Sequence, residues 1–442
     1  MTRLHVESLA YGGDAVGHLD DGRAAFVRLG CPGDVVDIDV TEDRGRFVRA
    51  EIRQLVEPSP DRVEAPCPYF GACGGCSWQH VSAAAQLVAK RRAVVEALSR
   101  IGGVLDAEEL VRPTVASPHA YGYRNKIELV ARTGPTGLVL GYHKAASEEV
   151  VPVESCLLLA PKSSKAPKAL SGALRYLSSG SQDLGLKRVG LRVATNTRDV
   201  EIALWTEPGP FPRRPVATTL GQAMRSSSIV RVLIKGTEKE RKVTGVEVLS
   251  GNGFWRERLL GTTMTISAPS FFQVNTQAAE ALVTLALDAM AADGTDRVVD
   301  LYAGAGTFTL PLAEVAGDVV AVEAASSAVR DLRRNLEEAQ VWADVVGGDA
   351  ERELKQIGHV DALLVDPPRS GLAGDTVAAI ALTGARTIVY VSCDPATLAR
   401  DARALAQHGY ALTTATPVDL FPQTYHVETV ATFARSADHK NA

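Results

Sequence analysis

The chain has 442 residues, of which 46% are hydrophobic and 22% are charged, and this balance excludes a largely disordered or fibrous protein. Its length is sufficient for about two to four domains. No apolar run approaches the roughly 20 residues that span a bilayer, and the N-terminus lacks the apolar stretch of a signal peptide. We therefore expect a cytoplasmic protein that has no membrane partner, and nothing in the sequence indicates an obligate protein partner.

The charge is unevenly distributed along the chain. The net charge is −5, yet residues 161–260 carry 18 basic and 8 acidic side chains, a net charge of +10. Such a block is typical of a phosphate-binding face or of an ordinary solvated surface, and charge alone does not choose between them. The candidate phosphate contacts in and around it are Lys162, Lys165, Lys168, Lys187, Arg188, Arg213 and Arg214.

Residues 1–57 read as a small β domain. Turn signals such as Gly12-Gly13 and Pro32-Gly33-Asp34 separate short runs with the alternation of strands, for example residues 35–40. Several strands in so few residues predict a compact β-barrel of the oligonucleotide-binding (OB-like) type. A Pro-rich linker follows at residues 57–60.

A second domain, α+β in class, is expected over residues 58–265. It begins with a cysteine motif, Cys67-x5-Cys73-x2-Cys76, and Cys156 follows about 80 residues later. Four thiolates suit either a tetrahedral zinc ion or an iron–sulfur cluster, and the spacing leaves both open. The glycines between the cysteines favour a cluster, because they let backbone amides face its sulfides. An amphipathic helix is predicted over 83–101, and then mostly strands with one helix near 165–178.

A group of aromatic and basic side chains opens the β-rich part of this domain. These side chains can stack on bases and grip a backbone, which indicates contact with single-stranded RNA. The alternative is that the tyrosines are core residues and the charges are only solvated. The group consists of Tyr121, Tyr123, Arg124, Asn125 and Lys126.

Strands and helices alternate from residue 266 to the C-terminus. Strands are predicted over 297–301, 319–322, 343–346, 362–365 and 387–391, and helices over 277–292, 326–340, 374–382 and 396–408. A pair of strands is predicted near 411–420 and 429–434. This order predicts a doubly wound, Rossmann-like α/β domain over 266–442, with its ligand at the carboxyl ends of the strands.

Four consecutive strand ends carry residues that suit a nucleoside cofactor. Gly304 and Gly306 allow close backbone approach, Glu323 suits a ribose diol, Asp349 suits an adenine edge, and Asp366 ends the fourth strand. The series resembles a class I S-adenosylmethionine-dependent methyltransferase. An unrelated nucleotide-binding fold is the alternative for the glycines alone.

Cys393 follows the fifth strand and precedes a helix, whose N-terminus is expected to stabilise a thiolate; a buried, inert cysteine is the ordinary alternative. Glu428 opens the last strand.

At this point the chain resembles the RNA 5-methyluridine methyltransferases, which include the tRNA uridine-54 and 23S ribosomal RNA enzymes. The matching stretches are Ser270-Phe271-Phe272-Gln273-Val274-Asn275, Asp300-Leu301-Tyr302-x-Gly304-x-Gly306, Asp366-Pro367-Pro368-Arg369-x-Gly371, Ser392-Cys393-Asp394-Pro395-Ala396-Thr397 and His426-Val427-Glu428-Thr429.

The resemblance implies a TRAM domain at residues 1–57 and a [4Fe–4S] cluster on the four cysteines. It also implies that Cys393 adds to carbon 6 of uracil, that Glu428 removes the carbon-5 proton, and that Asp366 lies near the base and the cofactor. The target base is expected to be flipped out of its stack. The residues that match S-adenosylmethionine-binding positions are Gln273, Tyr302, Gly304, Thr307, Glu323, Asp349 and Asp366. Ala303, Thr307 and Pro368 depart from common residues of the family, and none of these departures affects Cys393 or Glu428.

We therefore expect an RNA (uracil-5-)-methyltransferase, EC 2.1.1.-, that acts on 23S ribosomal RNA, with tRNA uridine 54 as the alternative substrate. A methyltransferase of DNA or of a small molecule fits less well, because a β domain and a basic block are attached. A non-catalytic RNA-binding protein is disfavoured because Cys393 and Glu428 are both present.

Overall fold

A computed structural model describes residues 2–134, 137–178, 183–236 and 242–436. The chain forms two compact units, one made of Met1–Ala120 with Asp366–Ala442 and the other of Tyr121–Val365. In the described part of the chain, no helix is long and apolar enough to cross a membrane.

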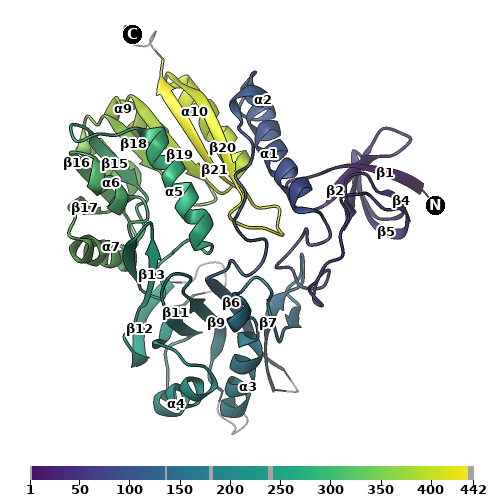
Figure 1. Cartoon of the computed structure of the whole chain (residues 1–442), viewed down its shortest axis with the longest axis horizontal. Helices are drawn as coiled ribbons and strands as arrows, with labels where there is room; N and C mark the ends of the chain where they lie inside the picture. The colour runs from purple at the N-terminus through teal and green to yellow at the C-terminus, as the bar shows by residue number, and fades with distance from the viewer. Residues whose placement is uncertain (1, 135–136, 179–182, 237–241, 437–442) are drawn as a thin grey trace. The chain divides into compact units, whose positions relative to one another are not determined.

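The N-terminal strands of the first unit close into a barrel with the strand order β1-β2-β3-β5-β4 (purple in Figure 1). Neighbouring strands pair antiparallel, except that β3 and β5 are parallel. Alternate side chains such as Val6, Val27, Val36 and Val48 fill the interior. The predicted barrel is therefore confirmed. Its strands are β1 (Thr2–Leu9), β2 (Ala15–His18), β3 (Ala24–Arg28), β4 (Val35–Asp43) and β5 (Phe47–Glu57).

The rest of the first unit combines helices with a three-stranded group. Helix α1 (Ala83–Arg100) packs against α10 (Pro395–Gln407), and the side chain of Ser82 caps α1. The strands lie in the order β19-β21-β20, with β21 antiparallel to both neighbours. The remaining elements are α2 (Ala107–Leu110), α9 (Thr376–Thr383), β19 (Thr387–Ser392), β20 (Tyr410–Val418) and β21 (Glu428–Arg435).

The second unit begins with a seven-stranded sheet in the order β12-β11-β10-β9-β6-β7-β8. Neighbouring strands of this sheet are antiparallel, except that β10 and β11 are parallel and are joined through helix α4. The elements are β6 (Lys126–Gly134), β7 (Gly137–His143), β8 (Val150–Pro152), the 3-10 helix η1 (Pro161–Ser163), α3 (Ala166–Ser178), β9 (Leu186–Val193), β10 (Val200–Thr206), α4 (Arg213–Ala223), β11 (Ser228–Lys235) and β12 (Lys242–Gly251). A hairpin of β13 (Trp255–Leu259) and β14 (Thr262–Ile266) follows.

The second unit ends with four strands in the order β17-β16-β15-β18, and each neighbouring pair is parallel. Strands and helices alternate along the chain here, as the sequence predicts for the methyltransferase part. The elements are α5 (Thr276–Met290), β15 (Arg297–Leu301), α6 (Thr309–Val315), β16 (Asp318–Glu323), α7 (Ser326–Ala339), β17 (Asp344–Gly347), α8 (Ala350–Ile357) and β18 (Ala362–Val365).

The sequence-based prediction differs from the structure mainly because it omits some helices. Helices α4 and α8 are absent from the prediction. Helix α4 has Pro215 near its start and threonines in its interior, and both features weaken the helical signal that propensity carries. Helix α8 is only eight residues long.

Candidate active site

Cys393 lies in the turn between β19 and α10, where the sequence places it. Its side chain is half-buried. The next residue, Asp394, is the N-cap of α10, and one carboxylate oxygen accepts from the amides of Ala396 at 2.9 Å and Thr397 at 3.0 Å. The strand end and the capped helix together hold the cysteine at a defined position.

The surroundings of Cys393 favour the protonated thiol in the protein by itself, and stabilisation of a thiolate by the helix N-terminus stays a prediction. Burial raises the pKa of the Cys393 thiol to about 12, and the negative charge of Glu428 raises it further. Asp366 and Asp394 act in the same direction, while the Arg369 guanidinium lowers this pKa. The amides at the helix N-terminus already donate to the Asp394 carboxylate. Its negative charge therefore offsets their partial positive charge near the Cys393 sulfur.

Glu428 is the first residue of β21 and is 4% exposed. Burial raises the pKa of its carboxyl well above the usual value, and the nearby charge of Asp366 adds to this effect. Arg369 opposes both. The first unit thus brings together the predicted catalytic residues Cys393, Glu428 and Asp366, and the two carboxyls are close enough to raise the pKa of the thiol.

Arg369 belongs to this site although sequence reasoning gave it no role. It is the one cation whose charge lowers the pKa of both Cys393 and Glu428 among the causes resolved for the described residues. The signal that could have found it is its place in the motif Asp366-Pro367-Pro368-Arg369. A cation in a motif that lies beside two carboxyls and a thiol is a candidate for control of their protonation.

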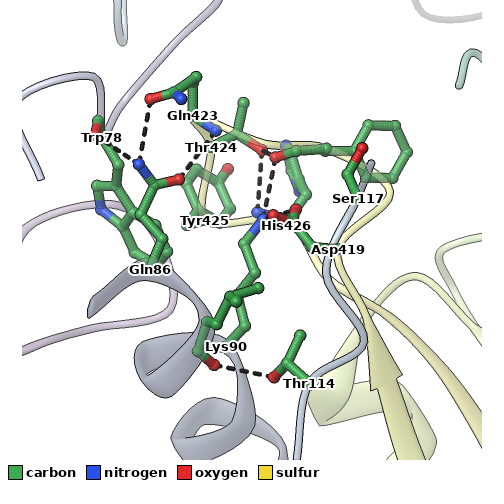
Figure 2. A network of polar contacts seen from close by, with 12 residues as sticks. Trp78, Gln86, Lys90, Thr114, Ser117, Asp419, Gln423, Thr424, Tyr425 and His426 are labelled. Carbon is green, nitrogen blue, oxygen red and sulfur yellow. Dashed lines mark hydrogen bonds and ion pairs between the residues drawn. The ribbon is translucent and has the colours of Figure 1, made fainter. Parts of the chain in front are cut away.

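The loop between β20 and β21, residues 419–427, leads directly to Glu428 and is held by buried polar groups (Figure 2). The ammonium of Lys90 is completely buried, pairs with Asp419 and donates to the carbonyl of Phe421 at 3.0 Å. Gln86 and Gln423 exchange two hydrogen bonds of 3.0 and 3.1 Å. Helix α1 therefore fixes the path of the chain into the glutamate.

Gln423 makes this loop turn sharply. Its φ of +70° lies in the left-handed region, which a side chain other than glycine rarely adopts. Its carbonyl accepts from the backbone amides of Ser77 and Trp78, both at 3.0 Å. These bonds offset the local strain of the turn.

The barrel also reaches the site, through the loop between β1 and β2. The hydroxyl of Tyr11 lies 3.3 Å from the carbonyl oxygen of Cys393 and 3.4 Å from a carboxylate oxygen of Asp394. Its ring meets that of Tyr425 edge to face, with centroids 5.4 Å apart. The indole of Trp78 donates to the carbonyl of Gly13 at 2.9 Å and anchors the same loop. Sequence reasoning missed Tyr11, because no local pattern connects residues so far apart.

The residues predicted to bind the cofactor lie in the second unit. The loop after β15 carries Tyr302, Gly304 and Thr307, and Tyr302 has the left-handed φ of +68°. The carboxylate of Glu323, at the end of β16, accepts from the amides of Gly304 at 2.9 Å and Ala325 at 2.6 Å. Asp349 caps α8 by accepting from two amides of its first turn. Glu323 thus links the glycine loop to the start of α7.

The two glycines of the loop play different parts. A Cβ on Gly304 would meet nothing within 4 Å, whereas a Cβ on Gly306 would come within 2.3 Å of Leu310 and 2.8 Å of Leu332. Both have positive φ. Gly306 is therefore needed for packing, and Gly304 leaves open space into which a ligand can come close to the backbone.

Two orphaned polar atoms fit a polar cofactor at these strand ends. The side-chain oxygen of Gln273 is buried and has no hydrogen-bond partner in the described part of the chain, and one carboxylate oxygen of Asp300 is in the same state. Burial raises the pKa of Asp300 to about 7. Unsatisfied acceptors of this kind favour a ligand that donates hydrogen bonds, such as the ammonium and hydroxyl groups of S-adenosylmethionine. Sequence reasoning gave Asp300 no role, although it stands at the end of a buried strand.

The predicted RNA-contact group is only partly on the surface. Tyr123 and Asn125 are 4% and 1% exposed, and the Asn125 amide donates to the carbonyl of Gln273 and the hydroxyl of Thr276. Lys126 pairs with Glu128 at 2.8 Å. Asn125 therefore holds the chain before α5, and the backbone amide of Arg124 donates to the carbonyl of Leu158 at 2.7 Å.

The four predicted cysteine ligands are divided between the two units. Cys67, Cys73 and Cys76 belong to the first unit and Cys156 to the second, and all four side chains have intermediate exposure. Among the residues that the structure describes, no three His, Cys, Asp or Glu side chains are arranged to hold a metal ion. One feature suits a ligand: the Gly75 amide donates to the Cys73 sulfur at 3.4 Å.

Comparisons with known proteins match both ends of the chain. Residues 255–346 and 350–436 match the family model of the tRNA (Uracil-5-)-methyltransferases, and residues 2–52 match the TRAM domain. An uncharacterized RNA methyltransferase of Thermosynechococcus vestitus is 34% identical over 98% of both chains. The 23S rRNA (uracil(1939)-C(5))-methyltransferase RlmD of Pseudomonas putida is 35% identical over 98% of this chain and 93% of its own length.

A solved structure is similar along the whole chain. It is the Pyrococcus abyssi tRNA (uracil-54, C5)-methyltransferase in complex with S-adenosyl-L-homocysteine. The TM-score is 0.74 and the identity 27%, over 98% of this chain and 100% of that one. The likeness extends from the barrel to the last strand, as the motifs do. The chain belongs to the family of RNA (uracil-5-)-methyltransferases with an N-terminal TRAM domain.

Proposed function

We propose that the protein methylates carbon 5 of one uridine in 23S ribosomal RNA with S-adenosylmethionine as the methyl donor. The observation that carries this proposal is the pairing of a thiol, Cys393, with a buried carboxyl, Glu428, in one site. The 23S rRNA relatives, 33–35% identical, support this RNA. A second candidate is uridine 54 of tRNA, which the similar archaeal structure favours.

Carbon 5 of uracil is a poor nucleophile, so the ring needs covalent activation. In our proposal the Cys393 thiol gives its proton to solvent, its sulfur bonds to carbon 6, and the electron pair of the ring's double bond moves toward carbon 5. When bound, S-adenosylmethionine would supply an electrophilic methyl group to carbon 5, with S-adenosylhomocysteine as the leaving group. Glu428 then removes the proton from carbon 5, the double bond re-forms and the Cys393 sulfur leaves.

The raised pKa of Glu428 suits the last step, and the charge of Arg369 suits the first. A Glu428 carboxyl buried beside Asp366 is a stronger base when ionised than an exposed one, so it is suited to take a proton from carbon. Arg369 favours the thiolate form of Cys393, and we assign it to the addition step. We assign Asp366 to holding the pyrimidine. Gln273, Tyr302, Gly304, Thr307, Glu323 and Asp349 would hold the cofactor, with the Gln273 oxygen on its donors.

The test is covalent trapping with RNA that contains 5-fluorouridine, whose carbon 5 has no proton to lose after methyl transfer. We expect the wild-type chain to form a denaturant-resistant adduct with 23S rRNA fragments and Cys393→Ala to form none. Absence of any adduct with the wild-type chain on 23S or tRNA substrates would contradict methyl transfer and favour an RNA-binding role. Mapping of 5-methyluridine in RNA from a deletion strain then identifies the missing site and separates 23S rRNA from tRNA.

We also propose, from the glycines between the cysteines and the resemblance to the family, that Cys67, Cys73, Cys76 and Cys156 hold a [4Fe–4S] cluster. The full chain purified without oxygen should contain about four iron and about four sulfide ions, and Cys73→Ser should lose them. One zinc ion and no sulfide would contradict the cluster and support the zinc alternative. No step of methyl transfer passes through this group.

The remaining sequence-based expectations are kept as proposals. They are the three-domain division at residues 1–57, 58–265 and 266–442, RNA contacts of the group from Tyr121 to Lys126, and a place in the cytoplasm, where both RNA substrates occur. Limited proteolysis tests the division, because cleavage should begin in the linkers between domains.

A further inference from the structure

A hollow with a volume of about 730 Å³ lies in the second unit, apart from the residues assigned to the cofactor. Three stretches of chain line it. These are η1 with the start of α3, the turn between β9 and β10, and the loop between α4 and β11. Its floor contains small and apolar side chains such as Ala166, Val193 and Ala194, and its rim contains hydroxyls and cations.

The hollow collects positive charge that nothing nearby neutralises. Four cations line it: Lys162, Lys165, Arg198 and Arg225. All four are exposed, and within the described residues none of them forms an ion pair or a side-chain hydrogen bond. The lining has one acid, Asp199, which is 7% exposed and bonded to the Arg256 guanidinium at 3.1 Å. The open surface of the hollow is therefore strongly positive.

Other cations of the same basic block are already paired. Lys168 pairs with Glu154, Lys187 with Glu207, Arg188 with Glu128 and Arg213 with Glu247, at 2.6–3.0 Å. Of the seven phosphate contacts predicted from the sequence, Lys162 and Lys165 alone line the hollow, and Arg198 and Arg225 join them. The tertiary structure thus places four unpaired cations of the block around one hollow.

The chemistry of the lining indicates an extended polyanion. A single buried anion is usually held by side chains that are themselves buried, whereas these four cations are exposed and distributed over three segments. Hydroxyls of Ser163, Thr197 and Ser226 stand among them. Lysine, arginine and hydroxyl side chains around an open trough are the usual contacts of a nucleic-acid backbone, which they position without reading its sequence.

We propose that this basic hollow, defined by Lys162, Lys165, Arg198 and Arg225, docks the sugar–phosphate backbone of the substrate RNA, in addition to the site that receives the target base. The inference rests on the proposed function. Each phosphate that the hollow neutralises releases counterions, so it contributes to affinity and to the dependence of affinity on salt, but not to the chemical step.

The experiment compares two double charge reversals in the full chain. Lys165→Glu/Arg225→Glu changes the hollow. Lys235→Glu/Lys242→Glu is the matched control, because both residues are exposed cations of the same unit outside the hollow, and within the described residues neither forms an ion pair. RNA affinity is measured by filter binding from low to high salt, and kcat and KM for methylation are measured separately. Thermal melts check that both variants fold.

We expect the hollow variant to bind RNA at least about tenfold more weakly near physiological salt and to lower the log–log salt slope by about two. Its KM should rise while kcat at saturating RNA stays unchanged, and the control should change affinity far less. Equal losses in both variants, or a fall in kcat alone, would overturn the proposal. Unchanged RNA affinity in the hollow variant would also overturn it and assign the hollow to another anion, such as an acidic protein segment.

Failure of the proposed function is distinguishable from failure of the hollow. If the wild-type chain forms no adduct and transfers no methyl group, the enzymatic proposal fails, while filter binding still reports on the hollow. If methylation proceeds and both variants bind alike, the hollow proposal fails alone.

Discussion

In the proposed mechanism, the protonation of two side chains controls the chemistry of this site. Cys393 has to lose a proton to attack a pyrimidine, yet burial and three carboxylates raise the pKa of its thiol. Glu428 is buried among the same charges. Arg369 is the cation that opposes these effects, so the balance between one guanidinium and its acidic neighbours sets how readily the site reacts.

The rate of adduct formation should therefore rise with pH from neutral to alkaline conditions, because only the thiolate attacks. Arg369→Met should raise the pKa of Cys393 further and slow single-turnover adduct formation by about tenfold at a fixed pH near 8. Arg369→Lys, which keeps the charge, should lie close to the wild type. A pH curve that Arg369→Met leaves in place would contradict the role assigned to this cation.

Glu428 also links stability to pH. Its folded-state pKa is raised above the ordinary value of 4.5, so the folded chain holds the proton more tightly than the unfolded chain. That stabilisation is complete below pH 4.5 and is lost as the pH rises through the raised folded pKa. Glu428→Gln, which cannot ionise, should exceed the wild type in unfolding free energy by about 1–2 kcal/mol at neutral pH.

Urea unfolding between pH 4 and pH 8 measures this difference, which should grow as the pH rises. Glu64→Gln serves as the control, since the Glu64 side chain is exposed, and this variant should show no such trend. The same Glu428→Gln chain should accumulate the methylated covalent adduct with ordinary RNA, because the base that releases Cys393 is gone. A constant stability difference at all pH values would argue against a buried, proton-retaining Glu428.

At the scale of elements, the position of Glu428, the proposed base, depends on a helix that is distant in sequence. Helix α1 supplies Lys90 and Gln86, and the loop between β20 and β21 supplies Asp419 and Gln423 (Figure 2). Breaking a buried ion pair is costly because the remaining charge has no partner, whereas replacing both charges by apolar groups is often nearly neutral.

Lys90→Met should consequently lower the free energy of unfolding by about 3–5 kcal/mol, and Lys90→Met/Asp419→Leu should recover most of this loss. Urea denaturation measures both. A denaturing gel should show that the single variant also accumulates methylated adduct, because the displaced loop misplaces Glu428. Equal stability of the single variant and the wild type would show that the pair does not hold the loop.

At the scale of the whole first unit, the TRAM barrel contributes a side chain to the turn that carries the nucleophile. Tyr11 is 382 residues away from Cys393 in the sequence, yet its hydroxyl lies within hydrogen-bonding distance of the Cys393 carbonyl and of Asp394. The barrel therefore has a positioning task within the site, in addition to any contact of its strands with RNA.

Tyr11→Phe removes these hydrogen bonds and keeps the ring contact with Tyr425. We expect adduct formation to slow by about 3–10-fold, the effect of one hydrogen bond of ordinary strength, while RNA affinity and the thermal midpoint stay close to the wild type. Tyr176→Phe, on a 73% exposed side chain in the other unit, is the control. A loss of stability without a change in the rate of adduct formation would assign Tyr11 a purely structural role.

The sequence by itself determined the order of the elements and the motifs that contain the residues proposed to react. Strands β15 and β18 match their predicted bounds, and the strand ends that carry Glu323, Asp349 and Cys393 were expected where they lie. Periodicity and turn residues act over a few positions, so short-range patterns are sufficient to read them. The motifs around Cys393 and Glu428 are equally local.

Only the tertiary structure decided the environment of those residues. The high pKa of Cys393, the orphaned oxygen of Gln273, the pairing of Lys90 with Asp419 and the contact of Tyr11 with the Cys393 turn all arise between segments that are distant along the chain. The same holds for the unpaired cations of the basic hollow. Burial and charge pairing depend on which surfaces pack together, and the packing of distant segments leaves no periodic trace in the sequence.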